Sequence, residues 1–309
     1  MPNDRHIETR EQLERALHAI AAQGGEVGLA ACNVETGEEV GHNASRPMPT
    51  ASVFKLPLLV EVFRQAETGT LDLDERVTLR ADDVVMGSGI LRDFQPGLQP
   101  TLRDVATMMI VVSDNGATNI LLDRVGGPPA VNAAMRGLGW PSIVVHRRIA
   151  FGEITTAGSL AEAAPRDLMQ LAASLAREEL VSPRASRAML AILSRQRYLE
   201  QFPRFVAYRP YAGDFGKAQP IAIYNKTGMI GGLRADTGVI TLGPEVKIAY
   251  SVVTDAGEDD AYRHEHPADI TNALIGRALV EYWLPGELPL EAAVYPSPYV
   301  DRMFAAAGL

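Results

Sequence analysis

The spacing of apolar and polar residues along the chain predicts strand-rich ends on either side of a long helical stretch. Residues 9–22 repeat apolar side chains at helical spacing, behind a threonine suited to cap the helix, and stop at two glycines. Residues 26–34 and 39–42 are rich in small apolar side chains and flank a short turn, which predicts two strands. A helix is then expected from about Thr50 to Gln65.

The middle of the chain is predicted to be helical and carries clear start signals. Thr101 and Asp104 resemble a capping box, and prolines open three of the later segments. These further helices are expected at residues 102–112, 115–125, 129–136, 165–176 and 183–193. Beyond residue 220, valine, isoleucine and tyrosine predict strands, and a last helix follows a proline. These elements are expected at 221–224, 238–242 and 246–253 for the strands and at 267–283 for the helix.

Strands at both ends with a helical block between them predict an α/β (α+β) fold. One antiparallel sheet would be assembled from the two ends and flanked by helices, and the block would form an all-helical second lobe. We expect a single domain at 1–286, with a sheet lobe from about 1–56 and 205–286 and a helical lobe at about 57–204. A tail would follow at 287–309. The crevice between two such lobes is the expected place for a ligand site.

Composition and charge narrow the classes of partner. Apolar residues make up 47% of the chain and charged residues 22%, as in soluble globular proteins. The 29 basic and 38 acidic residues give a formal net charge of −9, which argues against nucleic acid and anionic membrane surfaces as main partners. No run of 18 apolar residues occurs, so no membrane-spanning segment is expected. The composition predicts no oligomeric state.

Cysteine and histidine usage predicts a protein without a metal ion, and no cofactor is expected either. Cys32 is the single cysteine, which excludes an internal disulfide and a cysteine-based metal cluster. His264 and His266 flank an acidic residue but lack further ligands, and both are expected to be exposed. The first 15 residues lack the apolar core of a secretory signal, so a cytoplasmic location is expected.

The first candidate for catalytic chemistry is Ser52-Val53-Phe54-Lys55. A serine and a lysine three positions apart lie on one face of a helix, so the amine can reach the hydroxyl. A serine alcohol becomes a useful nucleophile when a base takes its proton, and lysine can be that base when burial or a nearby cation lowers its pKa. Alone, the pattern is more typical of a solvent-exposed helical turn, because it occurs by chance in many helices.

The second candidate, Ser113-Asp114-Asn115, lies between two predicted helices. Its serine could relay a proton to a leaving nitrogen, and its asparagine amide could bind both a lysine and a substrate carbonyl. The same residue types also form ordinary helix caps, and the motif by itself favours that interpretation.

The third candidate is Lys226-Thr227-Gly228, at the end of a predicted strand. The lysine supplies a fixed positive charge, the threonine supplies a hydroxyl, and the glycine lets a ligand approach the backbone closely. This motif is also weak evidence when it is taken alone.

Together and in this order, the three motifs resemble those of class A β-lactamases and penicillin-binding proteins. The surrounding segments PTASVFKLPLLVEVF, GSGILRDFQPGL, VVSDNGATNILLDRVGGPPAVNAAMRGLGW and NKTGMIGGLRADTGVI look like the class A branch. The resemblance extends over about residues 9–284. It implies a β-lactamase-like fold and serine acyl-enzyme chemistry on an amide, ester or β-lactam bond of a small-molecule acyl substrate.

The resemblance also implies roles for the catalytic residues. Ser52 would be the acylated nucleophile and Lys55 its general base. Ser113 would carry the proton to the leaving amine. Asn115 would orient Lys55 and the substrate.

Substrate-binding groups are implied in the same way. Lys226 and Thr227 would bind a substrate carboxylate, with Gly228 keeping the backbone accessible. The backbone N–H of Met229 and that of the nucleophile would form the oxyanion hole, in which one donor contributes about 10²–10³ in rate. Arg234 could add a second anchor for the carboxylate.

The chain departs from the class A pattern at the base that frees the acyl-enzyme. In that family a glutamate precedes a proline-led helix and is followed four residues later by asparagine. Here Glu153 is followed at that spacing by alanine and Glu162 by arginine, and the segment is short. Glu153 is therefore a weak candidate for the deacylation base. We expect acylation to be intact and hydrolysis of β-lactams to be slow.

Three activities are compatible with these observations. The first is a serine acyl-enzyme hydrolase that is slow on β-lactams. The second is an acyltransferase of a biosynthetic pathway that passes the same acyl group to an amine. The third is a module that binds β-lactams or peptides without turnover, and the completeness of the three motifs argues against it.

Residues 196–216 interleave six aromatic residues with three arginines before the third motif. The pattern fits packing under a long connection between elements. It also fits a rim that selects an aromatic or acidic group of the substrate.

Overall fold

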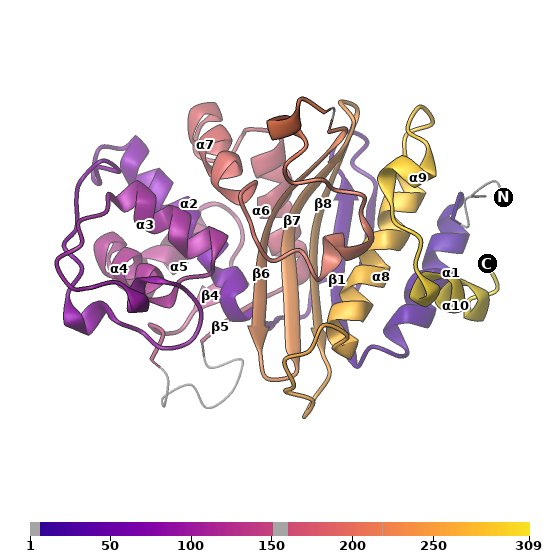
Figure 1. The fold of residues 1–309 in the computed structure, drawn as a ribbon, viewed down its shortest axis with the longest axis horizontal. Coiled ribbons are helices and arrows are strands. Elements are labelled where there is room, and N and C mark those ends of the chain that lie inside the picture. The colour runs from indigo at the N-terminus through magenta and orange to yellow at the C-terminus, as the bar shows by residue number, and fades with distance from the viewer. Residues whose placement is uncertain (1–6, 151–159, 218) are drawn as a thin grey trace.

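A five-stranded antiparallel sheet lies at the centre of the protein (Figure 1). In this computed structural model, which describes residues 7–150, 160–217 and 219–309, the strand order is β2-β1-β8-β7-β6. The strands are β1 (Glu26–Asn33), β2 (Glu39–His42), β6 (Ile221–Ile230), β7 (Leu233–Leu242) and β8 (Val246–Asp255). Two strands come from the start of the chain and three from beyond residue 220, which confirms a sheet assembled from both ends.

Strands β6 and β7 are each ten residues long, so the predicted spans of 221–224 and 238–242 were too short. A lysine, a threonine and a glycine interrupt the apolar pattern of β6, and an aspartate and a threonine interrupt that of β7. All five residues nevertheless lie within an unbroken antiparallel ladder. The prediction failed because these polar residues are buried inside the sheet, where the alternation rule expects apolar ones.

Helices cover both faces of the sheet (Figure 1). On one face, α8 (Pro267–Tyr282) and α1 (Arg10–Ala21) share a core with side chains such as Ala31. On the other face, α6 (Pro165–Ala176) packs against β1, β7 and β8 and contacts side chains such as Cys32. Neighbouring strand residues point to opposite faces, so one sheet supports two separate cores.

The middle of the chain forms a group of helices around a further apolar core at one end of the sheet (Figure 1). These helices are α2 (Lys55–Glu67), α3 (Leu102–Val111), α4 (Asn115–Val125), α5 (Gly127–Gly137) and α7 (Pro183–Leu193). Their bounds agree with the predicted ones to within two residues, except that α2 begins at Lys55 rather than near Thr50. The 3-10 turn η1 (Ala51–Phe54) takes the place of its expected first turn.

Short elements that no pattern predicted complete the structure. A small sheet in the order β3-β5-β4 consists of β3 (Met48–Pro49), β5 (Ala161–Ala163) and β4 (Val144–Val145). Further 3-10 turns among the described residues are η2 (Ala81–Asp83), η3 (Leu91–Asp93), η5 (Phe202–Phe205) and η6 (Gly213–Phe215). Segments of two to four residues are too short to show the periodicity from which sequence analysis infers an element.

The C-terminal segment packs on the body of the protein. It contains α9 (Leu290–Ala293) and α10 (Pro298–Ala306), whose apolar side chains join the core of α1 and α8. The backbone N–H of Tyr295 donates to the carbonyl oxygen of Phe205 at 2.8 Å. The tail is thus held by both apolar contacts and the backbone.

Expectations for residues outside the motifs are partly corrected. His264 is exposed, but His266 is fully buried, because its Nδ1 accepts a hydrogen bond from the backbone N–H of Ala268 and caps α8. Within the described ranges, no three histidine, cysteine or acidic side chains are grouped as a metal site would require. No described helix is both long enough and apolar enough to cross a membrane.

Gly276, in the middle of α8, lets the segment before β6 cross the helix closely. A Cβ atom at this position would lie 2.1 Å from the carbonyl oxygen of Phe202. Phe202 belongs to η5, and its ring stacks on Tyr250 of β8 with 3.5 Å between the ring centroids. The glycine is therefore required by packing rather than by its backbone conformation.

We predict that Gly276→Ala lowers the free energy of unfolding by about 2 kcal/mol or more, because a backbone carbonyl cannot move aside as a flexible side chain can. Gly137→Ala in α5 is the matched control, since nothing lies within 4 Å of its Cβ position. That variant should be neutral or more stable by up to about 1 kcal/mol. Urea denaturation measures both, and equal effects would contradict the close approach.

Candidate functional site

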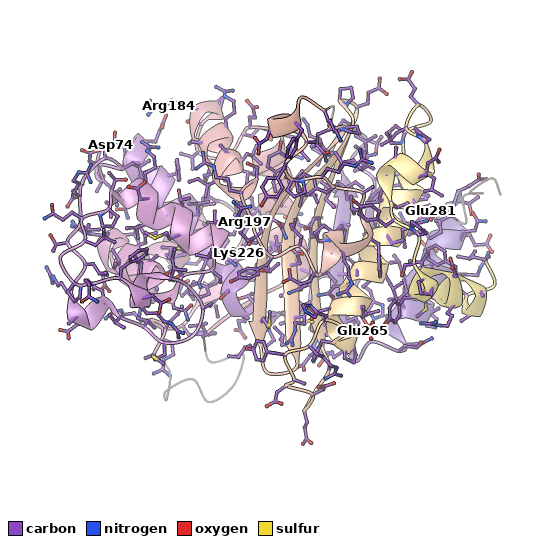
Figure 2. The ribbon with its side chains drawn as sticks, in the orientation of Figure 1. Asp74, Arg184, Arg197, Lys226, Glu265 and Glu281 are labelled. Carbon is purple, nitrogen blue, oxygen red and sulfur yellow. The ribbon has the colours of Figure 1, made fainter. Side chains whose placement is uncertain are left out.

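A cavity of about 510 Å³ opens between β6 and the helical lobe. Figure 2 shows Lys226 at the edge of the sheet that faces this lobe. The lining residues are Ala51, Ser52, Gly87, Ser88, Ser113, Asn115, Ile149, Leu160, Tyr198, Thr227, Met229, Ile230 and Tyr262. The structure therefore brings all three motifs to one cavity, although they are far apart in the sequence.

Ser52 lies in η1, directly before α2, and is half-buried. The preceding residue, Ala51, has a φ of 42°, in the left-handed region that residues with a Cβ rarely adopt. On the other side, a Cβ at Gly228 of β6 would lie 2.4 Å from the carbonyl oxygen of Thr50 and 3.1 Å from the Ser52 nitrogen. Only glycine lets β6 approach the serine backbone this closely. Met229 consequently lies in the same cavity wall as Ser52.

Lys55 is fully buried at the start of α2, and its amine faces the second motif. Its Nζ donates to the Ser113 carbonyl oxygen at 2.7 Å and lies 3.0 Å from Ser113 Oγ and 2.9 Å from Asn115 Oδ1. Burial, assisted by the positive charge of Lys226 and opposed by Asp114, lowers the pKa of Lys55 well below its ordinary value of 10.5. A neutral amine in this place can accept a proton.

The second motif is a helix cap and a part of the cavity wall at once. Asp114 is the N-cap of α4, and its Oδ2 also accepts hydrogen bonds from the backbone N–H groups of Ile90 and Leu91 at 2.6 and 2.7 Å. The aspartate thereby fastens the preceding loop to the helix. Ser113 has a φ of 54°, and in this conformation both its hydroxyl and its carbonyl contact the lysine amine.

Lys226 is fully buried within β6 and does not itself line the cavity. Its Nζ donates to the carbonyl oxygen of Thr227 at 2.6 Å, and Thr227 is a lining residue. Burial lowers the pKa of Lys226 to about 7, against the opposing attraction of Asp236. A positive charge on this lysine therefore acts on the cavity from behind Thr227.

Sequence analysis did not single out Asp236, a fully buried acid of β7. Its Oδ1 accepts hydrogen bonds from Asn225 Nδ2 at 3.0 Å and from the Tyr250 hydroxyl at 3.2 Å, and its Oδ2 accepts one from the Phe202 N–H at 3.3 Å. Burial raises the pKa of Asp236 to about 7 in spite of these donors and of Lys226. The signal that could have revealed it is an acidic residue inside an apolar strand pattern.

Arg234 does not occupy the place expected of a carboxylate anchor. Its guanidinium is 1% exposed and lies 3.3 Å from Asp269, and it also donates to the carbonyl oxygens of Gly231 and Leu233 at 2.7 and 3.0 Å. The ring of Tyr262 covers it at 5.7 Å. Arg234 is absent from the cavity wall because its donors are already used by the protein.

Of the two candidate deacylation bases, Glu153 lies outside the described residues. Glu162 is in β5, and its Oε1 lies 3.7 Å from His146 Nε2 rather than in the cavity wall. Among the described lining residues no side chain is acidic. This part of the wall therefore supplies no carboxylate that could activate a water molecule beside Ser52.

Some aromatic residues of segment 196–216 pack in the core and others lie at or near the surface, so the two interpretations of this segment apply to different residues. Phe202 and Phe205 are buried in the core with α8, whereas Tyr198 lines the cavity and Phe215 is 75% exposed. Apart from Met229, the other large apolar lining residues outside the motifs are Ile149, Leu160, Ile230 and Tyr262. Sequence analysis missed them because they come from separate segments that share no pattern.

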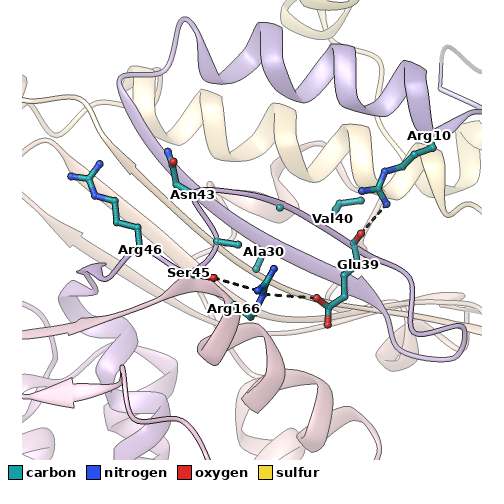
Figure 3. A pocket seen from close by; sticks show the side chains of 10 residues that line it. Arg10, Ala30, Glu39, Val40, Asn43, Ser45, Arg46 and Arg166 are labelled. Atoms are coloured by element: carbon teal, nitrogen blue, oxygen red, sulfur yellow. Dashed lines mark hydrogen bonds and ion pairs between the residues drawn. The ribbon is translucent and has the colours of Figure 1, made fainter.

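A second hollow, of about 520 Å³, lies beside the edge strand β2 (Figure 3). Its arginines are already paired: Arg166 lies 3.9 Å from Glu39, Arg46 pairs with Glu26, and Arg10 donates to the Glu39 carbonyl oxygen at 2.8 Å. This hollow contains no residue of the three motifs, so the cavity at Ser52 is the candidate site.

The buried carboxyl of Asp236 predicts how stability depends on pH. The folded protein keeps this proton up to about pH 7, whereas the unfolded chain loses it near 3.8, so wild-type stability falls as the pH rises between these values. Asp236→Asn removes the effect. Its free energy of unfolding relative to wild type should rise by about 1–3 kcal/mol from pH 5 to pH 7, measured by urea denaturation. A relative stability that stays constant over this range would instead indicate that Asp236 is already ionised at pH 5 in the folded protein.

Known proteins with similar sequences are β-lactamases. The profile of a family described as "Beta-lactamase enzyme family" matches residues 9–283. β-Lactamase L2 of Stenotrophomonas maltophilia is 36% identical over 115 residues, which are 37% of this chain and 38% of that protein. β-Lactamase SME-1 of Serratia marcescens is 32% identical over 116 residues, or 37% and 39% of the two chains. These alignments thus span less than half the length of the curated relatives.

Solved structures agree over more of the chain. A β-lactamase from Sphaerobacter thermophilus DSM 20745 superposes with a TM-score of 0.77 at 30% identity, covering 88% of this chain and 97% of that one. PBP-A superposes with a TM-score of 0.75 at 24% identity, covering 88% and 96%, and shows the similarity of the fold alone. Because the profile match runs from the start of α1 to the end of α8 and includes all three motifs, the chain belongs to the β-lactamase enzyme family.

Proposed function

We propose that the protein is a serine acyl-enzyme hydrolase that acts on an amide, ester or β-lactam bond of a small molecule. The observation that carries this proposal is the Lys55 amine, which is fully buried and hydrogen-bonded to Ser113 and Asn115. Its lowered pKa suits a general base at neutral pH, and Ser52 precedes it by one turn in the same site. Membership of a family with named β-lactamases supports the same chemistry.

In the acylation step, Ser52 Oγ attacks the carbonyl carbon of the substrate, and its proton passes to the Lys55 amine. The hydroxyl of Ser113, 3.0 Å from that amine, delivers a proton to the leaving nitrogen or oxygen. The backbone N–H groups of Ser52 and Met229 would bind the oxyanion that develops on the carbonyl. A new ester bond to the serine replaces the bond to the leaving group.

The remaining motif residues would support this step electrostatically. A charged Lys226 lowers the pKa of Lys55 and adds positive potential behind Thr227, where a carboxylate or carbonyl of the substrate would bind. Asn115 holds the lysine amine and is itself fixed by donating to the Met86 carbonyl oxygen at 2.9 Å. The base is therefore positioned before substrate binds.

We further propose that release of the acyl group is slow. The described cavity wall offers no carboxylate to activate water, and such general-base assistance typically contributes about 10²–10⁴ in rate. A long-lived acyl-enzyme can also be attacked by an amine, which is the acyltransferase alternative. The nature of the acceptor decides between the two.

Benzylpenicillin should form a covalent adduct with the wild-type protein, and intact mass spectrometry should show a gain equal to the whole penicillin, because ring opening releases no atoms. The adduct should be absent in Ser52→Ala. Ser88→Ala removes another hydroxyl of the cavity wall and is the matched control, which should still form the adduct. An adduct in Ser52→Ala, or none in the wild type, would contradict the proposal.

Once formed, the adduct should decay at least about 10²-fold more slowly than it forms. Decay in buffer is compared with decay in the presence of a primary amine. Acceleration with formation of the corresponding amide would identify an acyltransferase, and unchanged decay would identify water as the acceptor. Decay as fast as acylation would refute slow release.

The charge on Lys226 predicts the pH dependence of acylation. Because this charge lowers the pKa of Lys55, Lys226→Gln should raise that pKa, so the rising limb of the rate against pH should move to higher pH. The measurement is the rate of adduct formation between pH 5 and pH 10. A limb that stays in place or moves to lower pH would show that the two amines do not interact.

A further inference from the structure

The described wall of the cavity at Ser52 carries no charged side chain. Its polar groups are the hydroxyls and the amide of the motifs, together with Ser88. The rest of the wall is largely apolar. We call this part the apolar wall, and it consists of Ile149, Leu160, Tyr198, Met229, Ile230 and Tyr262.

Three basic side chains that could attract an acidic substrate group are held inside the protein. Lys55 and Lys226 are fully buried and hydrogen-bonded to the motif residues. Arg234 is bound by Asp269 and by backbone carbonyls, including that of Ala261 at 3.3 Å. A charged end of the acyl group placed against the described apolar wall, away from Thr227, would therefore lose water without gaining a counter-ion there, which is unfavourable.

Tyr262 gives the apolar wall an accessible surface. Its side chain is 77% exposed although it lines the cavity, and one face of its ring rests on the Arg234 guanidinium. The aromatic ring is thus supported from beneath and open to solvent. An apolar group placed against the exposed face of the ring would remove apolar surface of both the ring and the group from water.

We propose that the acyl group transferred to Ser52 is uncharged and apolar, with an aromatic or branched aliphatic end that packs against the apolar wall and against Tyr262 in particular. This inference rests on the proposed acyl-enzyme function and adds the class of acyl donor. The cavity of about 510 Å³ has the size of an ordinary small-molecule site. The hydroxyls surround the reacting carbonyl, and the apolar wall selects the remainder of the acyl group.

A series of p-nitrophenyl esters tests the proposal, since the leaving group is constant and only the acyl group changes. In each reaction the Ser52 oxygen forms an ester with the acyl carbon, p-nitrophenolate leaves, and the serine proton reaches solvent through Lys55. The probes are the phenylacetate, the acetate and the hemisuccinate. After division by the rate in buffer alone, the phenylacetate should acylate Ser52 about tenfold or more faster than the acetate. The hemisuccinate should be slower than the acetate.

Variants of the wall make the test specific. Tyr262→Ala should slow acylation by the phenylacetate about three- to tenfold and change that by the acetate little. Tyr262→Phe should restore the preference, because the ring rather than the hydroxyl makes the contact. Phe215→Ala is the matched control, since Phe215 is a similarly exposed aromatic residue, 75% exposed, that does not line the cavity. It should behave as wild type.

The outcomes separate this inference from the function on which it rests. A burst of p-nitrophenolate that is lost in Ser52→Ala, but shows equal rates or favours the hemisuccinate, would overturn the inference and leave the acyl-enzyme function intact. Traces that are identical for wild type and Ser52→Ala with every ester would overturn both. A Tyr262→Ala variant indistinguishable from Phe215→Ala would also overturn the assigned contact.

Discussion

The burial of two lysines at one junction is the constraint on which the rest of the structure depends. Lys55 and Lys226 are both fully buried, and removing an ammonium group from water costs several kcal/mol unless hydrogen bonds or loss of the proton compensate. Each amine has at least one oxygen acceptor within 3 Å, and an acidic residue, Asp114 or Asp236, acts on each from further away. The cost of burial appears as a lowered pKa, and a lowered pKa is what turns a lysine into a base.

This constraint explains features of the backbone that would otherwise be costly. Ala51 and Ser113 both have positive φ values, and each adjoins or belongs to the cavity wall. Conformations of this kind cost about 1–3 kcal/mol each and persist where the surrounding packing determines them. Here β6 packs closely against the 3-10 turn at Gly228, and Asp114 joins the second motif to α4 as its N-cap. The strained backbone conformations thus lie next to Ser52 and at Ser113, which the site must bring together.

The sequence predicted the helices and the assembly of the sheet from both ends, because apolar spacing and capping residues are local signals. The resemblance carried by the three motifs implied one shared site, and residues of each motif line one cavity. The sequence could not predict Asp236, which is a polar residue in a buried strand, or the ion pair of Arg234 with Asp269, which belongs to α8. It likewise could not predict that Leu160 and Tyr262 line the cavity. They depend on distant segments meeting in space, and no local pattern records that.

The pairing of β1 with β8 has a consequence for the order in which the molecule can form during synthesis. The first strands of the sheet find their main partner only after almost the whole chain has been made, and pairing between such distant segments is slow to form. Lys226 arrives with these same late strands, whereas Ser52 is made early. Reactivity is thereby tied to the completion of folding: an unfinished chain has the nucleophile but not the strand that completes its surroundings.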